Sequence, residues 1–306
     1  MAANPPILIS DDIHGLPFSK GLLAQSFMSA GLAPARAYAA AKQVEDRLRE
    51  TGDMPVSIGK LRALASNVLE ESAGREVASR YRKLQELLRL DKPLVIMVGG
   101  TTGVGKSTIA TEIAHRLGIT RIVSTDSIRE VMRGIFSKEL MPAIYESSFN
   151  AWRGLRVPVP HGANPVIVGF REQTAAVVTG IKSLVDRAAT EGVSMVIEGV
   201  HIVPGYLDAC VLCDARVVQL VIAVDDEDTH RSHFYIREVQ TDGTRAFEKY
   251  RANFANIRLL GGYIEDLAKE HGIPVVHSHQ LDRTVADTLE RVVNAVIGDE
   301  ASPSSP

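Results

Sequence analysis

The chain has 306 residues, of which 45% are hydrophobic and 23% charged, and its formal net charge is −3. This composition is typical of a soluble globular protein and leaves room for one large domain or two ordinary ones. Because the charge is slightly acidic, we expect no nucleic-acid partner. No apolar run approaches the roughly 18 residues that cross a membrane, so we expect no membrane partner, and homo-oligomerisation stays open.

The cellular compartment is indicated by the N-terminal residues and the cysteines. Residues 1–6 show neither the basic nor the apolar segment of a secretory signal, so we expect a cytoplasmic protein. Cys210 and Cys213 form a lone C-x-x-C, which lacks the other two ligands of a structural zinc site. They do not follow a strand as in thioredoxin-like proteins, so we expect both cysteines to be inert.

Residues 1–91 are predicted to form a small, mostly helical domain. After a short apolar strand at residues 7–9, apolar side chains recur at helical spacing in residues 17–30. Further helices are predicted at residues 35–49, 57–71 and 76–90. Pro93 cannot continue a helix, so the domain boundary is placed just before it.

Residues 92–300 are predicted to form an α/β domain with a parallel sheet flanked by helices, because strand and helix patterns alternate. The predicted strands are residues 94–98, 119–123, 193–197, 216–224 and 274–277. The longer predicted helices are residues 107–117, 172–191, 244–269 and 284–297. We expect an irregular insertion at residues 150–170, a kind of segment that often carries substrate contacts, and a disordered tail at residues 301–306.

A phosphate-binding motif follows the first predicted strand and precedes a predicted helix. It matches G-x-x-x-x-G-K-[ST], which makes the α/β domain one of the P-loop NTPase type. Its glycines let successive N–H groups point into one concavity at a helix N-terminus. We expect Lys106 to reach the β- and γ-phosphates of a bound nucleoside triphosphate and the Ser107 hydroxyl to ligate Mg²⁺. The predicted nucleotide-binding residues are Gly100, Thr101, Thr102, Gly103, Val104, Gly105, Lys106, Ser107 and Thr108.

Carboxylates follow two other strands, at the sheet edge where ligands bind in open α/β folds. Asp126 comes just after the second predicted strand and Glu198 directly after the third. Both are candidate Mg²⁺ ligands, and Asp126 is also the candidate base for an acceptor hydroxyl. The alternatives are a helix cap, which either Thr125 or Asp126 could supply, and an ion pair for Glu198. His201 either contacts an anionic substrate or is merely hydrogen-bonded.

Arginines near these strand ends are candidate phosphate ligands. Arg231 and Arg237, on the helix predicted after the fourth strand, either neutralise the transferred phosphoryl group as lid arginines or complement the helix dipole. Arg129 and Arg133 are four residues apart on one helix face, where they bind an anionic acceptor unless neighbouring glutamates neutralise them. Further candidates are Arg153, Arg156 and Arg171.

Three of these segments, residues 99–110, 124–133 and 196–205, are together similar to the 2-phosphoglycerate kinase family. Residues 17–24, with Gly31-Leu32 and Ala37-Tyr38, resemble the ATP-cone-like module that precedes the kinase domain in archaeal members. The resemblance implies transfer of the γ-phosphoryl group of ATP to the 3-hydroxyl of 2-phosphoglycerate, giving 2,3-bisphosphoglycerate and ADP. It places Lys106 on the transferred group and Ser107 on Mg²⁺. Because this small, phosphorylated acceptor carries a carboxylate and a phosphate, the resemblance also implies that several basic side chains of the protein surround it.

Two other functions are compatible with the same residues. One is a kinase for another metabolite, such as a nucleoside, a sugar or a sugar phosphate. The other is a non-catalytic ATP-sensing regulator, although Asp126 and Glu198 favour an enzyme because sensing requires no acceptor base. The N-terminal module either binds regulatory nucleotide or serves for packing or dimerisation, and the lack of a Gly-rich loop there favours the second.

Overall fold

The structure, a computed structural model, describes residues 7–10, 15–51, 55–87, 91–207, 214–240 and 247–300. Cys210, Cys213 and the predicted tail at residues 301–306 lie outside these ranges. The chain divides into two compact units, Met1–Arg89 with His115–Gly118, and Leu90–Ala114 with Ile119–Pro306. Within the described ranges, no helix is long and apolar enough to cross a membrane.

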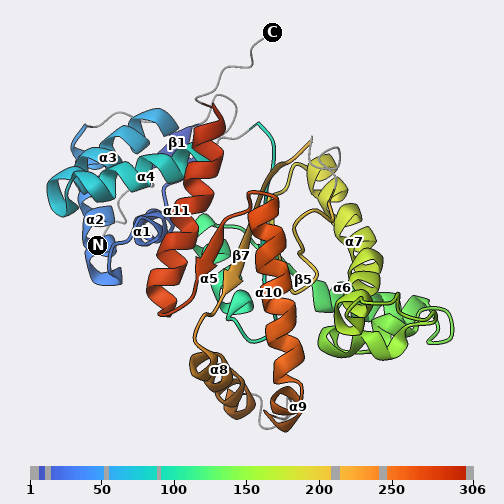
Figure 1. The fold of residues 1–306 in the computed structure, drawn as a ribbon. Helices are drawn as coiled ribbons and strands as arrows, with labels where there is room; N and C mark the ends of the chain where they lie inside the picture. Colours follow the sequence, from blue (N-terminus) through green and yellow to red (C-terminus); the bar gives the residue numbers. More distant parts are fainter. Residues whose placement is uncertain are drawn as a thin grey trace. The chain divides into compact units, whose positions relative to one another are not determined.

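In the part of the first unit that the structure describes, four helices combine with a small sheet, and Figure 1 shows how the helices are arranged. The helices are α1 (Lys20–Ser29), α2 (Pro34–Thr51), α3 (Ile58–Ala73) and α4 (Arg75–Leu87). The strands β1 (Leu8–Ser10), β2 (Gly15–Pro17) and β3 (Val56–Ser57) form a sheet in the order β2-β1-β3. Side chains start two of the helices, because Ser19 and Ser57 accept hydrogen bonds from first-turn N–H groups of α1 and α3.

Small and aromatic side chains build the core of this unit. Alanines at positions 37, 40 and 41 give α2 a buried face on which other helices can approach closely. Phe27 of α1 is fully buried and meets the Tyr81 ring of α4 edge to face, with ring centroids 5.4 Å apart. Such pairs add to the stabilisation from apolar burial.

The second unit is built on a five-stranded parallel sheet in the order β5-β6-β4-β7-β8. Its strands are β4 (Leu94–Gly99), β5 (Arg121–Ser124), β6 (Met195–Glu198), β7 (Arg216–Ala223) and β8 (Val275–His277). Its α-helices are α5 (Lys106–Leu117), α6 (Thr125–Ile135), α7 (Pro165–Glu191), α8 (Glu227–Gln240), α9 (Phe247–Ala252), α10 (Phe254–Glu270) and α11 (Leu281–Glu300). This parallel sheet with flanking helices confirms the predicted fold class.

Both faces of the sheet are covered, as is usual for parallel sheets. On one face, Met97 of β4 and Ile197 of β6 pack in one cluster with Ile128 of α6 and Ile181 of α7. The intervening residues of β4 are also fully buried, so the opposite face is closed too. Helices α10 and α11 both contact β7 (Figure 1). This packing fixes the carboxyl ends of the strands as one rim.

Two sequence-based expectations about this unit differ in part from the structure. Of the segment predicted as an irregular insertion, residues 155–164 are irregular, but its start lies in the 3₁₀ helix η2 (Ser148–Gly154) and its end in α7. Another 3₁₀ helix, η1 (Pro142–Tyr145), precedes the segment. Helix α7 begins at Pro165 because Asn164 caps it and proline fits the first helical turn. The single helix predicted at residues 244–269 is instead divided at Asn253 into α9 and α10, and residues 241–246 lie outside the described ranges.

Candidate active site

The P-loop connects β4 to α5, as the motif predicts. Gly100, Gly103 and Gly105 have φ values of 126°, 89° and 89°, conformations that only glycine adopts without strain. A Cβ at Gly103 would collide with the Phe234 ring of α8. The loop therefore turns tightly and delivers its N–H groups to the N-terminus of α5, where the helix dipole also favours anions.

A cavity of about 620 Å³ lies over this loop. Most of the predicted ATP-binding residues line it, namely Thr102, Gly103, Gly105, Lys106, Ser107 and Thr108. Predicted residues from two further strand ends join them: Asp126, Arg129 and Glu198. The other predicted loop residues, Gly100, Thr101 and Val104, line a smaller cavity of about 260 Å³ beside β7 and α10.

Glu198 and Ser107 both line this cavity and are hydrogen-bonded to each other. Strand β6 runs parallel to β4 in a register that pairs Glu198 with Val98, so the carboxylate lies beside the start of the P-loop. The Ser107 hydroxyl donates to Glu198 Oε1 at 3.0 Å, and Glu198 is only 8% exposed. Lys106 is equally buried, and its Nζ donates to the Thr101 carbonyl at 2.6 Å. A hydroxyl, a carboxylate and an ammonium group thus converge where the motif predicts phosphate.

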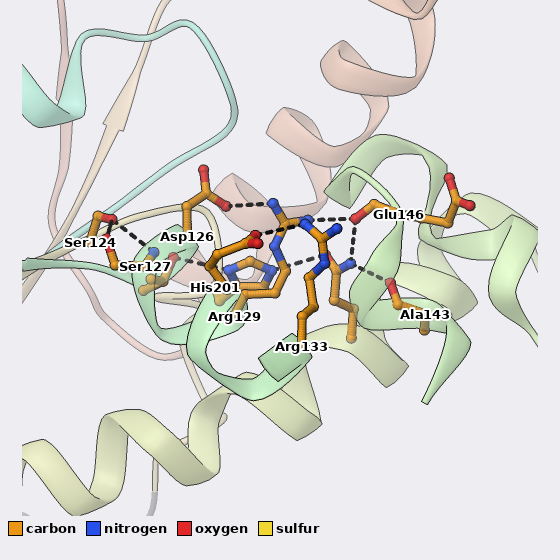
Figure 2. A network of polar contacts seen from close by, with 11 residues as sticks. Ser124, Asp126, Ser127, Arg129, Arg133, Ala143, Glu146 and His201 are labelled. Atoms are coloured by element: carbon orange, nitrogen blue, oxygen red, sulfur yellow. Dashed lines mark hydrogen bonds and ion pairs between the residues drawn. The ribbon is translucent and has the colours of Figure 1, made fainter. Parts of the chain in front are cut away.

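Asp126 lies in the first turn of α6 and faces the same cavity. The helix cap is Ser124, which accepts from the Ser127 N–H, so neither Thr125 nor Asp126 caps the helix. The Asp126 carboxylate is 64% exposed and pairs with Arg129 at 3.2 Å. Arg129 also donates to the Glu146 carbonyl at 2.5 Å, which fixes its guanidinium beside Asp126 (Figure 2). An exposed carboxylate and a held guanidinium therefore stand side by side.

His201 does not reach the cavity, so direct contact with substrate is not its role in this structure. It is fully buried, with Nδ1 2.9 Å from Thr125 Oγ1 and Nε2 2.9 Å from Gln173 Oε1. Gln173 in turn donates to the Ala143 and Glu146 carbonyls at 2.6 and 3.0 Å. Burial lowers the pKa of His201 to about 3, against a smaller opposing effect of Asp126. The imidazole is neutral and joins α6, α7 and η1 beneath the site.

Two of the proposed phosphate-binding arginines, Arg133 and Arg231, are absent from the cavity lining among the described residues. Arg133 pairs with Glu130 at 2.6 Å and stacks over the Tyr145 ring. Arg231 pairs with two acidic residues in the first turn of α8 and lies over the Phe254 ring. The side chain of Arg237 lies outside the described residues. The lining also omits Arg153, Arg156 and Arg171.

Sequence reasoning missed several residues that line the cavity. Helix α8 contributes His233, helix α9 contributes Lys249 and Tyr250, and the start of η2 contributes Ser148. Lys249 is a cation that no motif marks. The sequence signal was weak because these residues stand on segments whose position depends on tertiary packing rather than on a strand end.

Comparison with known proteins identifies relatives over almost the entire chain, although no protein-family model matches it. It is 38% identical to 2-phosphoglycerate kinase of Methanothermobacter thermautotrophicus over 295 residues, 95% of this chain and 96% of the relative. Identity to the 2-phosphoglycerate kinase of Thermococcus kodakarensis is 42% over 274 residues, 90% and 92% of the two chains. For that of Methanopyrus kandleri it is 37% over 287 residues, 94% and 87% of the two chains.

Solved structures are less similar. Shikimate kinase from Acinetobacter baumannii in complex with shikimate aligns with a TM-score of 0.41 and 16% identity, over 72% of this chain and 99% of that chain. The sequence relatives, in contrast, match over most of their own length. This chain belongs to the 2-phosphoglycerate kinase family.

Proposed function

We propose that this protein transfers the γ-phosphoryl group of ATP to the 3-hydroxyl of 2-phosphoglycerate, giving 2,3-bisphosphoglycerate and ADP. The observation that carries the proposal is the convergence of Lys106, Asp126 and the Ser107–Glu198 pair on one cavity, in a chain of this family. Phosphoryl transfer needs little covalent chemistry from the protein. It needs two reactants held in line and the charge of the transferred group neutralised.

The nucleotide half of the reaction falls to the P-loop. Its N–H groups and the N-terminus of α5 would hold the ATP phosphates, and Lys106 would shift from the Thr101 carbonyl to the transferred group. Both Lys106 and Glu198 are at most 8% exposed. Electrostatic interactions at such buried positions are screened less than at the surface, so Lys106 stabilises developing negative charge effectively.

The residues at the rim suit Mg²⁺. Ser107 Oγ and Glu198 Oε1 are oxygen donors 3.0 Å apart, and Asp126 lines the same cavity. Mg²⁺ sites in proteins that bind nucleotides commonly combine one or two carboxylates with water and substrate phosphates. When bound there with ATP, Mg²⁺ would neutralise phosphate charge.

The acceptor half of the reaction falls to Asp126 and its neighbours. Its exposed carboxylate would orient the 3-hydroxyl and accept its proton as the new O–P bond forms. The acceptor carries a carboxylate and a phosphate, which require cations. Arg129 and Lys249 line the cavity and are the best placed to bind them. Arg129 would serve two purposes, because it would bind an anionic group of the acceptor and it also pairs with Asp126.

The first test is ADP release from ATP and Mg²⁺ with 2-phosphoglycerate, 3-phosphoglycerate, glycerate or no acceptor. Release that depends on 2-phosphoglycerate supports the proposal, and Lys106→Ala, checked by its unfolding profile, should abolish it without unfolding the protein. ADP release with a different acceptor would support kinase activity but contradict 2-phosphoglycerate as the substrate. Binding of ATP without release on any acceptor would favour the ATP-sensing regulator.

The helical first unit is proposed to be the ATP-cone-like module, used for packing or dimerisation. Its separate core, centred on Phe27 and Tyr81, supports a module of its own. Titration of the full chain with ATP tests this assignment against a regulatory site. One binding event per chain agrees with it, and a second event that survives Lys106→Ala would contradict it.

A further inference from the structure

Two histidines of α8 bind consecutive carbonyl groups of the P-loop. His230 Nε2 lies 2.8 Å from the Thr102 carbonyl oxygen, and His233 Nδ1 lies 2.9 Å from the Gly103 carbonyl oxygen. Because a carbonyl oxygen only accepts, each of these ring nitrogens must carry the proton and donate it. The two hydrogen bonds therefore fix both tautomers and join the helix to the loop across more than a hundred residues of sequence.

The surroundings of His230 make this contact rigid. Its side chain is fully buried, stacked on Phe234 at 5.3 Å and packed against the edge of Phe254 at 5.4 Å between ring centroids. Its Nδ1 is buried and no described residue bonds it, as suits an unprotonated nitrogen. Burial lowers the pKa of His230 to about 4, so the ring is neutral near pH 7. Phe234 also closes the space beneath Gly103.

Because of peptide geometry, these two hydrogen bonds also orient backbone N–H groups of the P-loop. In a planar trans peptide the C=O and N–H point in opposite directions. When the carbonyls of Thr102 and Gly103 are held toward α8, the N–H groups of Gly103 and Val104 are held away from α8. A hydrogen bond at the carbonyl oxygen also polarises the peptide, which strengthens its N–H as a donor.

We propose that His230 and His233 are positioning residues that clamp the P-loop from α8 and preset two of its N–H groups for the phosphates of ATP. The proposal rests on the nucleotide site of the proposed function and extends it to residues outside the motif. It also links α8, the helix of the candidate lid arginines, to phosphate binding. Any change that loosens α8 then weakens the phosphate site, and bound phosphate in turn stabilises α8.

Paired variants separate the hydrogen bond from the volume of the ring. His230→Phe retains the aromatic stack and loses the donor, whereas His230→Gln places an amide N–H near the position of Nε2. His233→Ala loses the donor, whereas His233→Asn places an amide N–H near that of Nδ1. His161→Ala, which removes an exposed histidine of the same unit, is the matched control. Unfolding profiles establish that each variant is folded.

The readout is the affinity of the full-length protein for MgATP and for inorganic tripolyphosphate, measured by calorimetry. A net hydrogen bond corresponds to about a 3- to 10-fold change in affinity. We expect His230→Phe and His233→Ala to weaken both ligands by that factor, His230→Gln and His233→Asn to stay within about twofold of wild type, and His161→Ala to be unchanged. Tripolyphosphate has no base or ribose. If a variant loses as much affinity for tripolyphosphate as for MgATP, the effect therefore lies at the phosphate-binding groups.

Two results would overturn the clamp. One is unchanged affinity in both donor-less variants, and the other is an equal loss in the amide variants, which would mean that ring volume and not the hydrogen bond matters. If His230→Phe does not fold, the His233 pair decides, because that side chain is only partly buried. Since binding is measured without acceptor, failure of the clamp and failure of the proposed reaction are distinguishable.

Discussion

Removing the His201 imidazole should change how stability depends on pH. The folded-state pKa of about 3 lies below the ordinary value of 6.5, because burial disfavours the imidazolium. Below pH 6.5, His201 therefore binds a proton in the unfolded chain but not in the folded protein. The contribution of His201 to the free energy of unfolding is complete above pH 6.5 and is lost as the pH falls toward 3.

The size of this effect follows from linkage. One pKa unit corresponds to about 1.4 kcal/mol, so lowering the pH by 1.5 units below 6.5 costs the wild type about 2 kcal/mol through His201 alone. His201→Gln can still hydrogen-bond to Thr125 or Gln173 but does not titrate. We expect it to be less stable than wild type at pH 7.5, by about 1–3 kcal/mol, and to lose about 2 kcal/mol less on going to pH 5.

The assay is urea unfolding at pH 7.5, 6.5, 5.5 and 5.0, followed by the fluorescence of the single tryptophan, Trp152. This residue stands in η2, whose backbone packs against Gly169 of α7, the helix that also holds Gln173. The signal therefore reports the unit that contains the network. His161→Gln should retain the wild-type slope. Equal losses between pH 7.5 and 5 in wild type and His201→Gln would refute the assignment of a neutral, buried imidazole.

Three further substitutions probe the site directly. Asp126→Asn should lower kcat by roughly 10²-fold or more in steady-state assays, and an unchanged rate would leave Asp126 only as a partner of Arg129. Glu198→Gln should raise the Mg²⁺ concentration needed for half-maximal rate in an MgCl₂ titration, and an unaltered titration would argue against a metal role. Gly103→Ala forces a side chain into a φ of 89° and against Phe234, with about 1–2 kcal/mol of backbone strain alone. It should weaken MgATP binding at least about tenfold, and wild-type affinity would contradict the loop geometry.

Sequence reasoning succeeded where the chemistry is local or tied to a strand end. The P-loop is a contiguous motif, and its strand, loop and helix occur as predicted. Asp126 and Glu198 were predicted to lie at one edge of the sheet because parallel strands end on a common rim, and both line the cavity. The register between β5 and β6, which pairs Ser124 with Glu198, explains why two segments so far apart in sequence meet there.

Sequence reasoning failed where packing between distant helices determines the position of a side chain. His201 follows a strand end as a substrate ligand would, but its orientation is set by Gln173, 28 residues earlier on α7. His230 and His233 belong to no motif, and their contact with the P-loop depends on how α8 is seated. Arg231 was a candidate phosphate ligand, with a role at the helix dipole as the alternative, and in this structure acidic neighbours in its own helix and the Phe254 ring hold it.

The pairing of β4 with β6 also constrains when the site can appear during folding. The Leu94 N–H donates to Ser194 Oγ across 100 residues, and Ser107 meets Glu198 across 91. Contacts of such large sequence separation form slowly, because a long loop must close before they contribute. A nascent chain that ends within α7 already contains the complete P-loop motif but no β6. Full nucleotide affinity should therefore arise only after β6 has been synthesised and inserted between β5 and β4. The gain of nucleotide affinity then marks a late step of folding.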